Sequence, residues 1–296
     1  MIVNQAALAG IYQSFSTIFA EAFAGVKSMA ELVATVVPST GAQVDYKWLG
    51  SFPGMRKWMG ERVISNLSAF KYTIVNEKFE ATIGVDRDDI EDDQIGVYKP
   101  MIQGLAHSAA THPDELVYAL MKLGFSEKCY DGQYFFDTDH PVGSGDSVAS
   151  VSNFGGGAGT PWFLLDLSRP IKPMLLQIRR KPEFVALDDP KDEQSFMRNK
   201  YLYGVDDRKA VGFGLWQLAY GSKDTLNAAN FEAALTAMSS LKNDEGKPLG
   251  VRATHLFVPP TLLGAGKDVV EKQFLANGES NKWFKTVELV DVPWLA

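Results

Sequence analysis

The chain has 296 residues, 46% of them hydrophobic, so it is long enough to bury one large core or two ordinary ones. A net charge of −7 excludes the overall basic surface that drives sequence-independent binding to nucleic acid. The single cysteine, Cys129, cannot form an internal disulfide, and no apolar run is long enough to cross a bilayer. We therefore expect a soluble protein that needs no oxidising compartment.

Residues 5–36 carry apolar side chains at helical spacing, beginning with Leu8, Ile11 and Phe15, which predicts an amphipathic helix or a pair of helices. A helix that lies on a membrane surface is typically rich in Lys and Arg, and this segment contains only Lys27. We expect it to pack on protein. The pattern does not say whether that protein is the chain's own core or a neighbour's.

Residues 43–90 differ in character, because Tyr72, Ile74 and then residues 79–85 alternate as in strands, on either side of a predicted turn at 76–78. A Gly-rich loop precedes them. Its large apolar and basic side chains are Lys47, Trp48, Phe52, Met55, Arg56, Lys57, Trp58 and Arg62. So many such side chains in one loop are unfavourable on an isolated monomer, and they predict a partner surface.

An acidic run comes next. It consists of Asp86, Asp88, Asp89, Glu91, Asp92 and Asp93. The run lacks the Gly that an EF-hand calcium loop requires, so we interpret it as a solvated or partner-facing patch.

Residues 96–124 predict one long helix, the spine helix, with Pro100 in its first turn and Gly124 at its C-terminal cap. Pro113 predicts a kink or break near His112, because proline removes an internal hydrogen bond. The predicted core stripe is Val97, Met101, Leu105, Ala109, Leu116, Leu120 and Leu123.

The remaining chain predicts strands at 162–167 and 200–220, the latter with a turn at Asp206 and Asp207. A helix at 227–241 capped by Asn227, a strand at 255–258, a helix at 262–275 and a strand at 286–295 follow. Helices and strands do not alternate regularly, which favours an α+β fold over a doubly wound sheet.

The strongest candidate for catalytic chemistry is the group Asp137, Asp139 and His140, which could serve a metal-dependent hydrolase. The same residues are also typical of a tight surface turn, and we favour the turn. Cys129 has no sequence context that would activate a thiolate. We expect no catalytic residue, no metal and no cofactor.

Six phrases in this order resemble the major head subunit (gpT) family of Mu-like phages, a branch of the Hong Kong-97-type capsid fold. They are residues 46–59 (YKWLGSFPGMRKWM), 78–93 (KFEATIGVDRDDIEDD), 112–116 (HPDEL), 131–141 (DGQYFFDTDHP), 203–216 (YGVDDRKAVGFGLW) and 257–260 (FVPP). The resemblance implies an N-terminal arm (1–41), an extended β-hairpin called the E-loop (42–92), a peripheral domain (93–160 and 195–224) with the spine helix 96–124, and an axial domain (161–194 and 225–296).

The function implied by the resemblance is structural and not enzymatic. Hexamers and pentamers of the chain would tile an icosahedral shell around the double-stranded DNA of a tailed phage, with the DNA as a non-specific neighbour. The shell would assemble in the cytoplasm of the bacterial host and become part of the virion, without a membrane. A separate scaffold protein, a portal and a decoration protein are further implied partners. An encapsulin-like cellular compartment is the alternative within the same fold, and genomic neighbours would discriminate the two.

The charge pattern adds one expectation about the contact between subunits. We expect the basic E-loop of one subunit, with Trp48, Phe52 and Trp58, to lie against an acidic surface of its neighbour, with the acidic run 86–93 as the first candidate.

Overall fold

The structure is a computed structural model and describes residues 4–50, 72–92, 94–143, 148–275 and 277–296. Its α-helices are α1 (Gln5–Gly25), α2 (Ala30–Val33), α3 (Arg87–Glu91), α4 (Lys99–Leu123), α5 (Glu193–Arg198), α6 (Ala228–Ser239) and α7 (Leu263–Val270). Its strands are β1 (Ala34–Pro38), β2 (Gln43–Asp45), β3 (Thr73–Val75), β4 (Glu77–Asp86), β5 (His140–Val142), β6 (Ala149–Val151), β7 (Phe154–Gly157), β8 (Trp162–Leu165), β9 (Met174–Leu187), β10 (Lys200–Phe213), β11 (Ala219–Lys223), β12 (His255–Val258) and β13 (Glu288–Asp291).

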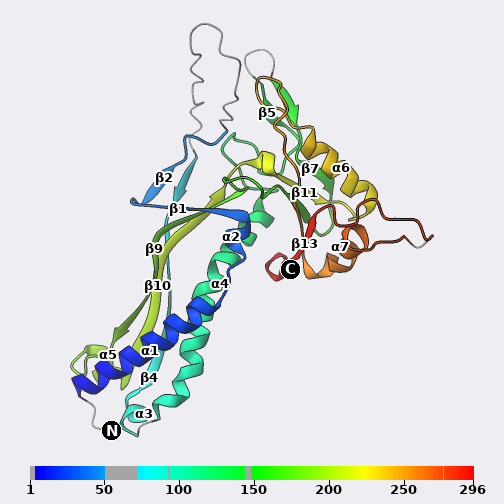
Figure 1. The fold of residues 1–296 in the computed structure, drawn as a ribbon. Coiled ribbons are helices and arrows are strands. Elements are labelled where there is room, and N and C mark those ends of the chain that lie inside the picture. Colours follow the sequence, from blue (N-terminus) through cyan, green and yellow to red (C-terminus); the bar gives the residue numbers. More distant parts are fainter. Residues whose placement is uncertain (1–3, 51–71, 93, 144–147, 276) are drawn as a thin grey trace.

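Two sheets divide the fold, as Figure 1 shows. The long sheet has the strand order β1-β9-β10-β4 and carries α1 and α4, whereas the second sheet, of order β13-β12-β8-β11-β7, lies with α6 and α7. The predicted division assigned residues 161–194 and 195–224 to different domains, yet β9 and β10 pair along their length in one sheet. None of the helices among the described residues combines the length and apolarity needed to span a bilayer.

Strand β10 contradicts the predicted turn at Asp206 and Asp207, because it runs without interruption from Lys200 to Phe213. Its pairing with β9 shifts in register between Asp206 and Arg208 and again between Arg208 and Lys209, so the strand continues through these charged residues. The Lys209 ammonium donates to Asp207 Oδ2 at 2.6 Å, which compensates the charge that a turn would have exposed to solvent. Both side chains are buried.

Helix α4 is the predicted spine helix, and Pro113 lies inside it without ending it. Its buried face consists of Ile102, Leu105, Ala106, Ala110, Thr111, Asp114, Val117, Tyr118 and Met121. The predicted stripe was wrong at Val97, Met101 and Leu123, which are 61%, 46% and 49% exposed, whereas Leu105 is buried and Ala109 and Leu120 pack against the cores. The buried face of α4 differs from the predicted stripe because it includes two polar residues, Thr111 and Asp114, which a search for apolar residues leaves out.

Asp114 is buried because it caps the segment that follows α1. Its Oδ1 atom accepts hydrogen bonds from the Ser28 hydroxyl at 2.5 Å and from the Ala30 backbone N–H at 2.7 Å, at the start of α2. An aspartate in this role satisfies backbone N–H groups that have no partner within a helix. The spine helix thereby fixes the point at which the N-terminal segment turns into β1.

Helix α1 packs on the chain's own long sheet. Its buried residues are Leu8, Ile11, Phe15 and Phe19. The Phe15 ring meets Tyr203 edge to face with centroids 5.1 Å apart, and the Phe19 and Phe184 centroids are 5.2 Å apart. The predicted helical region extended to residue 36, but residues 34–38 form β1, which pairs in parallel with β9.

The base of the predicted E-loop hairpin is confirmed, because β2 and β3 pair antiparallel through Gln43↔Val75 and Asp45↔Thr73. The predicted turn at 76–78 is reduced to Asn76, since β4 already begins at Glu77. Helix α6, which lies beside the second sheet, begins after Asn227 as expected. The Asn230 backbone N–H donates to Asn227 Oδ1 at 2.9 Å and so caps the helix. Helix α7 and strand β13 are confirmed in place but are shorter than predicted.

Candidate functional site

The predicted basic loop is described only at its base. Lys47 is exposed, while Trp48 is partly buried against the main core and meets Tyr46 edge to face with centroids 6.0 Å apart. The Tyr46 hydroxyl donates to Gln177 Oε1 at 2.8 Å, which ties this base to β9. The other predicted interface residues of the loop, Phe52, Arg56, Lys57, Trp58 and Arg62, lie outside the described residues.

Four carboxylates of the acidic run have partners within the chain. Asp86 lies 3.6 Å from the Lys200 ammonium, and Glu91 forms an ion pair with Arg87 at 2.9 Å. Asp88 accepts from the Asn199 side chain at 3.2 Å, and Asp89 accepts from the Tyr98 hydroxyl at 2.5 Å. Asp92 is exposed, and Asp93 lies outside the described residues. A neighbour that binds this run therefore meets carboxylates that already take part in local contacts.

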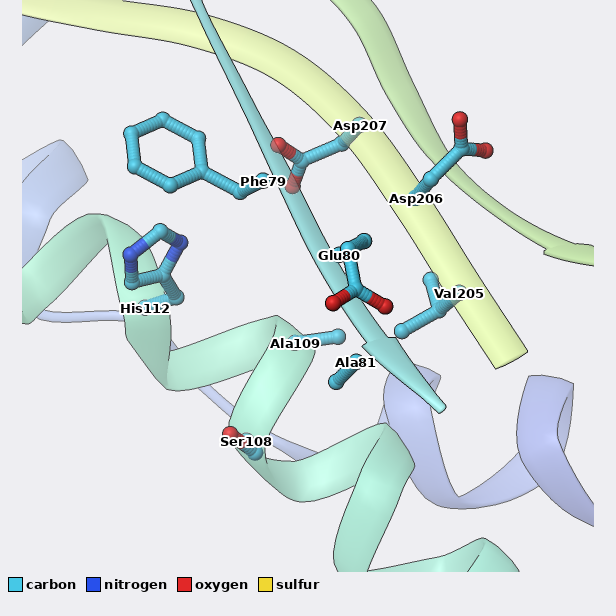
Figure 2. A pocket seen from close by; sticks show the side chains of 9 residues that line it. All are labelled: Phe79, Glu80, Ala81, Ser108, Ala109, His112, Val205, Asp206 and Asp207. Carbon is cyan, nitrogen blue, oxygen red and sulfur yellow. The ribbon is translucent and has the colours of Figure 1, made fainter. Parts of the chain in front are cut away.

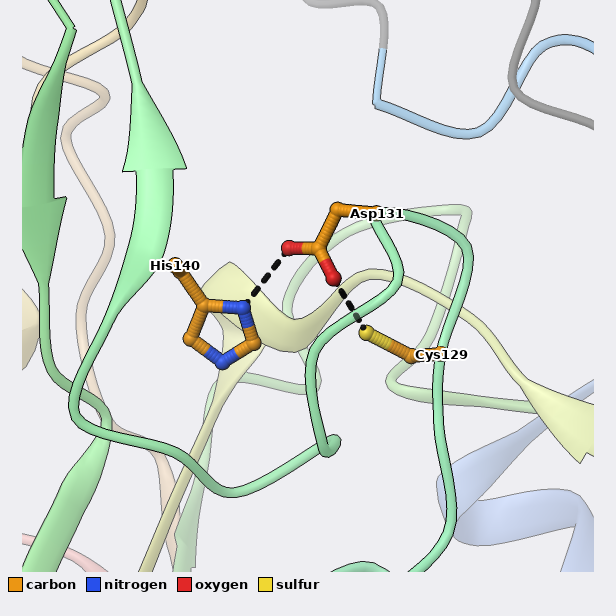
Figure 3. A group of neighbouring side chains, drawn as sticks. All are labelled: Cys129, Asp131 and His140. Carbon is orange, nitrogen blue, oxygen red and sulfur yellow. Dashed lines mark hydrogen bonds and ion pairs between the residues drawn. The ribbon is translucent and has the colours of Figure 1, made fainter.

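A cluster of three potential metal ligands lies elsewhere, at Cys129, Asp131 and His140 (Figure 3). Asp131 stands between the other two. Its Oδ1 atom accepts from the Cys129 thiol at 3.1 Å and from the Gln133 N–H at 3.0 Å, and its Oδ2 atom lies 2.7 Å from His140 Nδ1. The carboxylate thus bridges the other two side chains.

His140 is fully buried and held on both sides. Its ring stacks on Trp216 with centroids 3.9 Å apart and an interplanar angle of 9°. Nε2 lies 3.2 Å from Asn153 Oδ1, and the Asn153 amide nitrogen donates to backbone carbonyls, among them that of Phe135 at 2.8 Å. Asn153 Oδ1 must therefore accept, so Nε2 carries a proton.

The pKa directions agree with a closed hydrogen-bonded network. Burial raises the pKa of Asp131, but the hydrogen bond and charge of His140, with the donors from Cys129 and Gln133, outweigh burial and leave this pKa below its ordinary value. Burial, together with the nearby Asp131 carboxylate, raises the pKa of the Cys129 thiol well above its ordinary value. The three side chains are thus joined by hydrogen bonds in which Cys129 donates as a thiol.

The hydrolase candidate formed by Asp137, Asp139 and His140 is not assembled as a site. The two oxygens of Asp137 accept from the Tyr134 and Thr138 backbone N–H groups at 3.1 and 2.7 Å, as in a tight turn. Asp139 is exposed, and its contact with Asp137 raises its pKa. The turn was correctly predicted, but His140 is not on the surface, because it faces Asp131 and Asn153.

A second buried acid–base pair consists of Asp207 and Lys209 in β10, and Asp207 also lines a pocket between β4, β10 and α4 (Figure 2). Neither this pair nor the partners Asp131 and Asn153 was identified as functional or structural from the sequence. The only available signal was that Asp131 and Asp207 fall within phrases that resemble the gpT family.

Comparison with known proteins matches almost the entire chain to one protein family. The family model described as "Mu-like prophage major head subunit gpT" matches residues 8–295. The major capsid protein of Escherichia phage Mu is 38% identical over 305 residues that cover 100% of both chains. The chain belongs to the Mu-like gpT major head subunit family. A further gpT-type relative, the Mu-like prophage FluMu major head subunit of Haemophilus influenzae, is 41% identical over 90% of this chain and 89% of its own.

Solved capsids place the gpT fold among Hong Kong-97-type phage capsid proteins. The procapsid of bacteriophage JBD30 matches with a TM-score of 0.90 and 47% identity, over 99% of this chain and 100% of the other. The JBD30 capsid matches with a TM-score of 0.78 and 36% identity over 100% of both chains. As a gpT-family member the chain is a structural component of a phage head. Its family favours this role over an encapsulin-like compartment.

Proposed function

We propose that many copies of this chain assemble, as hexamers and pentamers, into a closed icosahedral shell that encloses double-stranded phage DNA. The support is the full-length similarity to the JBD30 procapsid at a TM-score of 0.90, which exceeds the 0.78 for the JBD30 capsid. We infer that the described conformation is that of a subunit in a precursor shell. Assembly takes place in the bacterial cytoplasm, and the finished shell belongs to the virion.

Electron microscopy of the purified protein tests this proposal. Closed shells of uniform diameter are expected, whether formed by the protein alone or after addition of a scaffold protein from the same phage. Uniform small particles under both conditions would contradict the proposal.

We infer a non-enzymatic role with no metal or cofactor. The support is that both carboxylate oxygens of Asp137 accept from backbone N–H groups of a local turn, and that Asp131 bridges Cys129 and His140 by hydrogen bonds. Metal analysis of the purified protein tests this inference, and a stoichiometric metal whose removal abolishes a measurable turnover would contradict it.

The proposed partners beyond the chain itself are a scaffold protein, a portal, a decoration protein and the packaged DNA as a non-specific neighbour. A decoration partner is supported by a relative, since one matching JBD30 structure is described as a capsid decorated with minor capsid protein trimers. We retain the N-terminal arm (1–41) and the E-loop (42–92) as proposals, although β1 and β4 within these ranges pair in the long sheet. We propose that the peripheral and axial domains follow the two sheets, so that β9 belongs with β10 and α4.

We also propose that the basic E-loop of one subunit contacts a neighbour, with the acidic run 86–93 as one acceptor. Exposed ion pairs contribute about 0 to 1 kcal/mol each, so the charges would act mainly on register and association rate. Reversing two of them, Arg56→Glu with Lys57→Glu, should lower shell yield while the subunit stays folded. The matched control, Arg56→Lys with Lys57→Arg, keeps the charge. Wild-type shell yield from the double reversal would refute this contact.

A further inference from the structure

A groove lies where the end of α1, the middle of α4 and strand β9 come together. Helices α1 and α4 lie against each other in Figure 1, and the groove is lined by the turn that follows α1, by α4 up to Pro113, and by parts of β9 and β10. Its volume is about 640 Å³. Pockets that hold ligands typically measure about 300–1,000 Å³, so the groove has room for several side chains of a guest.

Much of the lining is apolar. Phe23 and Val26 come from the end of α1 and the residue after it, and Ile178 and Pro182 come from β9. All four are only partly buried, so each still exposes apolar surface in the chain by itself. Apolar side chains gathered in a concave surface are typical of a site that binds a partner.

Helix α4 is missing a hydrogen bond at the wall of this groove. Pro113 has no N–H group and cannot donate to the Ala109 carbonyl four residues before it, and both residues line the groove. That carbonyl therefore lacks its ordinary helical donor. A backbone N–H of an extended guest chain is a donor of the kind it accepts.

The charges of the groove favour an anionic guest. Four of the five charged residues that line it are basic, although the whole chain has a net charge of −7, and Glu31 is the exception. Lys209 and Arg180 already have carboxylate partners in β10. Lys27 and Lys181 are exposed, and neither has an ion-pair partner among the described residues. These two ammonium groups can therefore bind the carboxylates of another molecule.

An acidic peptide matches the apolar and the basic features together. It can place one apolar side chain in the groove while adjacent Asp or Glu side chains reach the lysines, whereas duplex DNA presents phosphates and would leave the apolar lining uncovered. We propose that this groove binds an extended acidic segment of a partner protein, anchored by one apolar side chain, with its carboxylates on Lys27 and Lys181. This binding surface goes beyond the proposed self-assembly, because its occupant is not a copy of the chain.

The first test measures binding by fluorescence anisotropy. The probes are labelled peptides in which one Leu, Phe or Trp is flanked on both sides by Glu, added to the full chain. Saturable binding is expected, weakened by added salt and weakened severalfold when Ser replaces the apolar residue of the peptide. The proposal is overturned if no peptide of the set binds. It is also overturned if a labelled DNA duplex binds as tightly as the best peptide, since the lysines would then form a general anion-binding surface.

The second test locates the site with charge reversals. Lys27→Glu and Lys181→Glu change exposed side chains, so each variant should fold, by circular dichroism, and should bind the best acidic peptide severalfold more weakly. Lys99→Glu makes the same charge change at an exposed position in the first turn of α4 and is the matched control, with wild-type binding expected.

The double variant Lys27→Glu with Lys181→Glu should prefer peptides that carry Lys in place of Glu, which loss of folding would not produce. Wild-type binding of the acidic peptide by the double variant, or equal weakening by Lys99→Glu, would overturn the assignment. The measurement needs no assembly, so its outcome is separate from the success or failure of shell formation.

Discussion

Two buried acid–base pairs among the described residues differ in how completely their polar atoms are hydrogen-bonded. In the Asp131–His140 pair, both carboxylate oxygens and both ring nitrogens have partners, and the histidine ring also stacks on Trp216. In the Asp207–Lys209 pair, Asp207 Oδ1 is buried and has no hydrogen-bond partner among the described residues. A saturated network of buried polar groups stabilises one fold, whereas an unsaturated one leaves binding capacity for another group. Burial alone does not tell these cases apart.

The largest expected effect comes from removing the centre of the saturated pair. His140→Ala would create a cavity against Trp216 and remove the His140 contacts of Asp131 Oδ2 and Asn153 Oδ1, so the free energy of unfolding should fall by about 4 kcal/mol. Chemical denaturation of the isolated subunit measures it. Asp139→Asn, at an exposed neighbouring position, is the control and should change little. A loss under about 1 kcal/mol for His140→Ala would show that the network is not a main source of stability.

Breaking the unsaturated pair should cost somewhat less. Lys209→Met leaves Asp207 buried without its ammonium partner, and we expect a loss of roughly 3 kcal/mol in unfolding free energy. The double variant Asp207→Leu with Lys209→Met removes both charges and should recover much of this loss, measured in the same denaturation experiment. If the double variant is as unstable as the single one, packing and not the unpaired charge determines the cost.

A smaller effect is expected in the pH dependence of stability. Because the folded pKa of Asp131 lies below its unfolded value of about 3.9, its ionised form adds stability above that value. The contribution is lost as the pH falls through the folded pKa. The difference in unfolding free energy between the wild type and Asp131→Asn should therefore be constant from pH 7 to pH 5 and shrink below pH 4. A difference that grows on acidification would contradict the direction of the shift.

The smallest perturbation probes the thiol at the edge of the saturated network. Burial raises the pKa of Cys129, and Asp131 holds its S–H group, so the folded subunit should not be alkylated by iodoacetamide at pH 8. Intact mass measurement should show complete labelling once denaturant is added. Rapid labelling of the folded protein would mean that this network opens readily.

The fold was predictable mainly because ordered phrases along the chain resemble one family, and local patterns placed several elements, such as α6 behind its Asn227 cap. The buried polar residues were not predictable. Asp114 belongs to the core face of α4 because it caps α2, a contact between residues 84 positions apart. Asp207 suggested a turn because its partner Lys209 gives no signal in a pattern based on polarity. In each case a polar residue is buried by a partner that local periodicity does not reveal.

The interface residues were predictable only as a charge pattern. The basic loop and the acidic run are visible in the sequence, but the internal ion pairs of Asp86 and Glu91 depend on the fold. The pocket beside Asp207 combines residues from β4, α4 and β10, which come together only in three dimensions. The sequence therefore identifies the charged clusters but does not identify this pocket.

The long sheet ends in β4, whose outer side has no neighbouring strand among the described residues. An exposed strand edge is a template on which another chain can add a strand, and this hazard grows when hundreds of copies are made in one cell. Glu77, Lys78 and Glu80 project exposed charges along this edge. They make open-ended growth by strand addition unfavourable. Specific side-chain contacts between copies can close into a finite particle, whereas strand pairing at the β4 edge would produce a fibre.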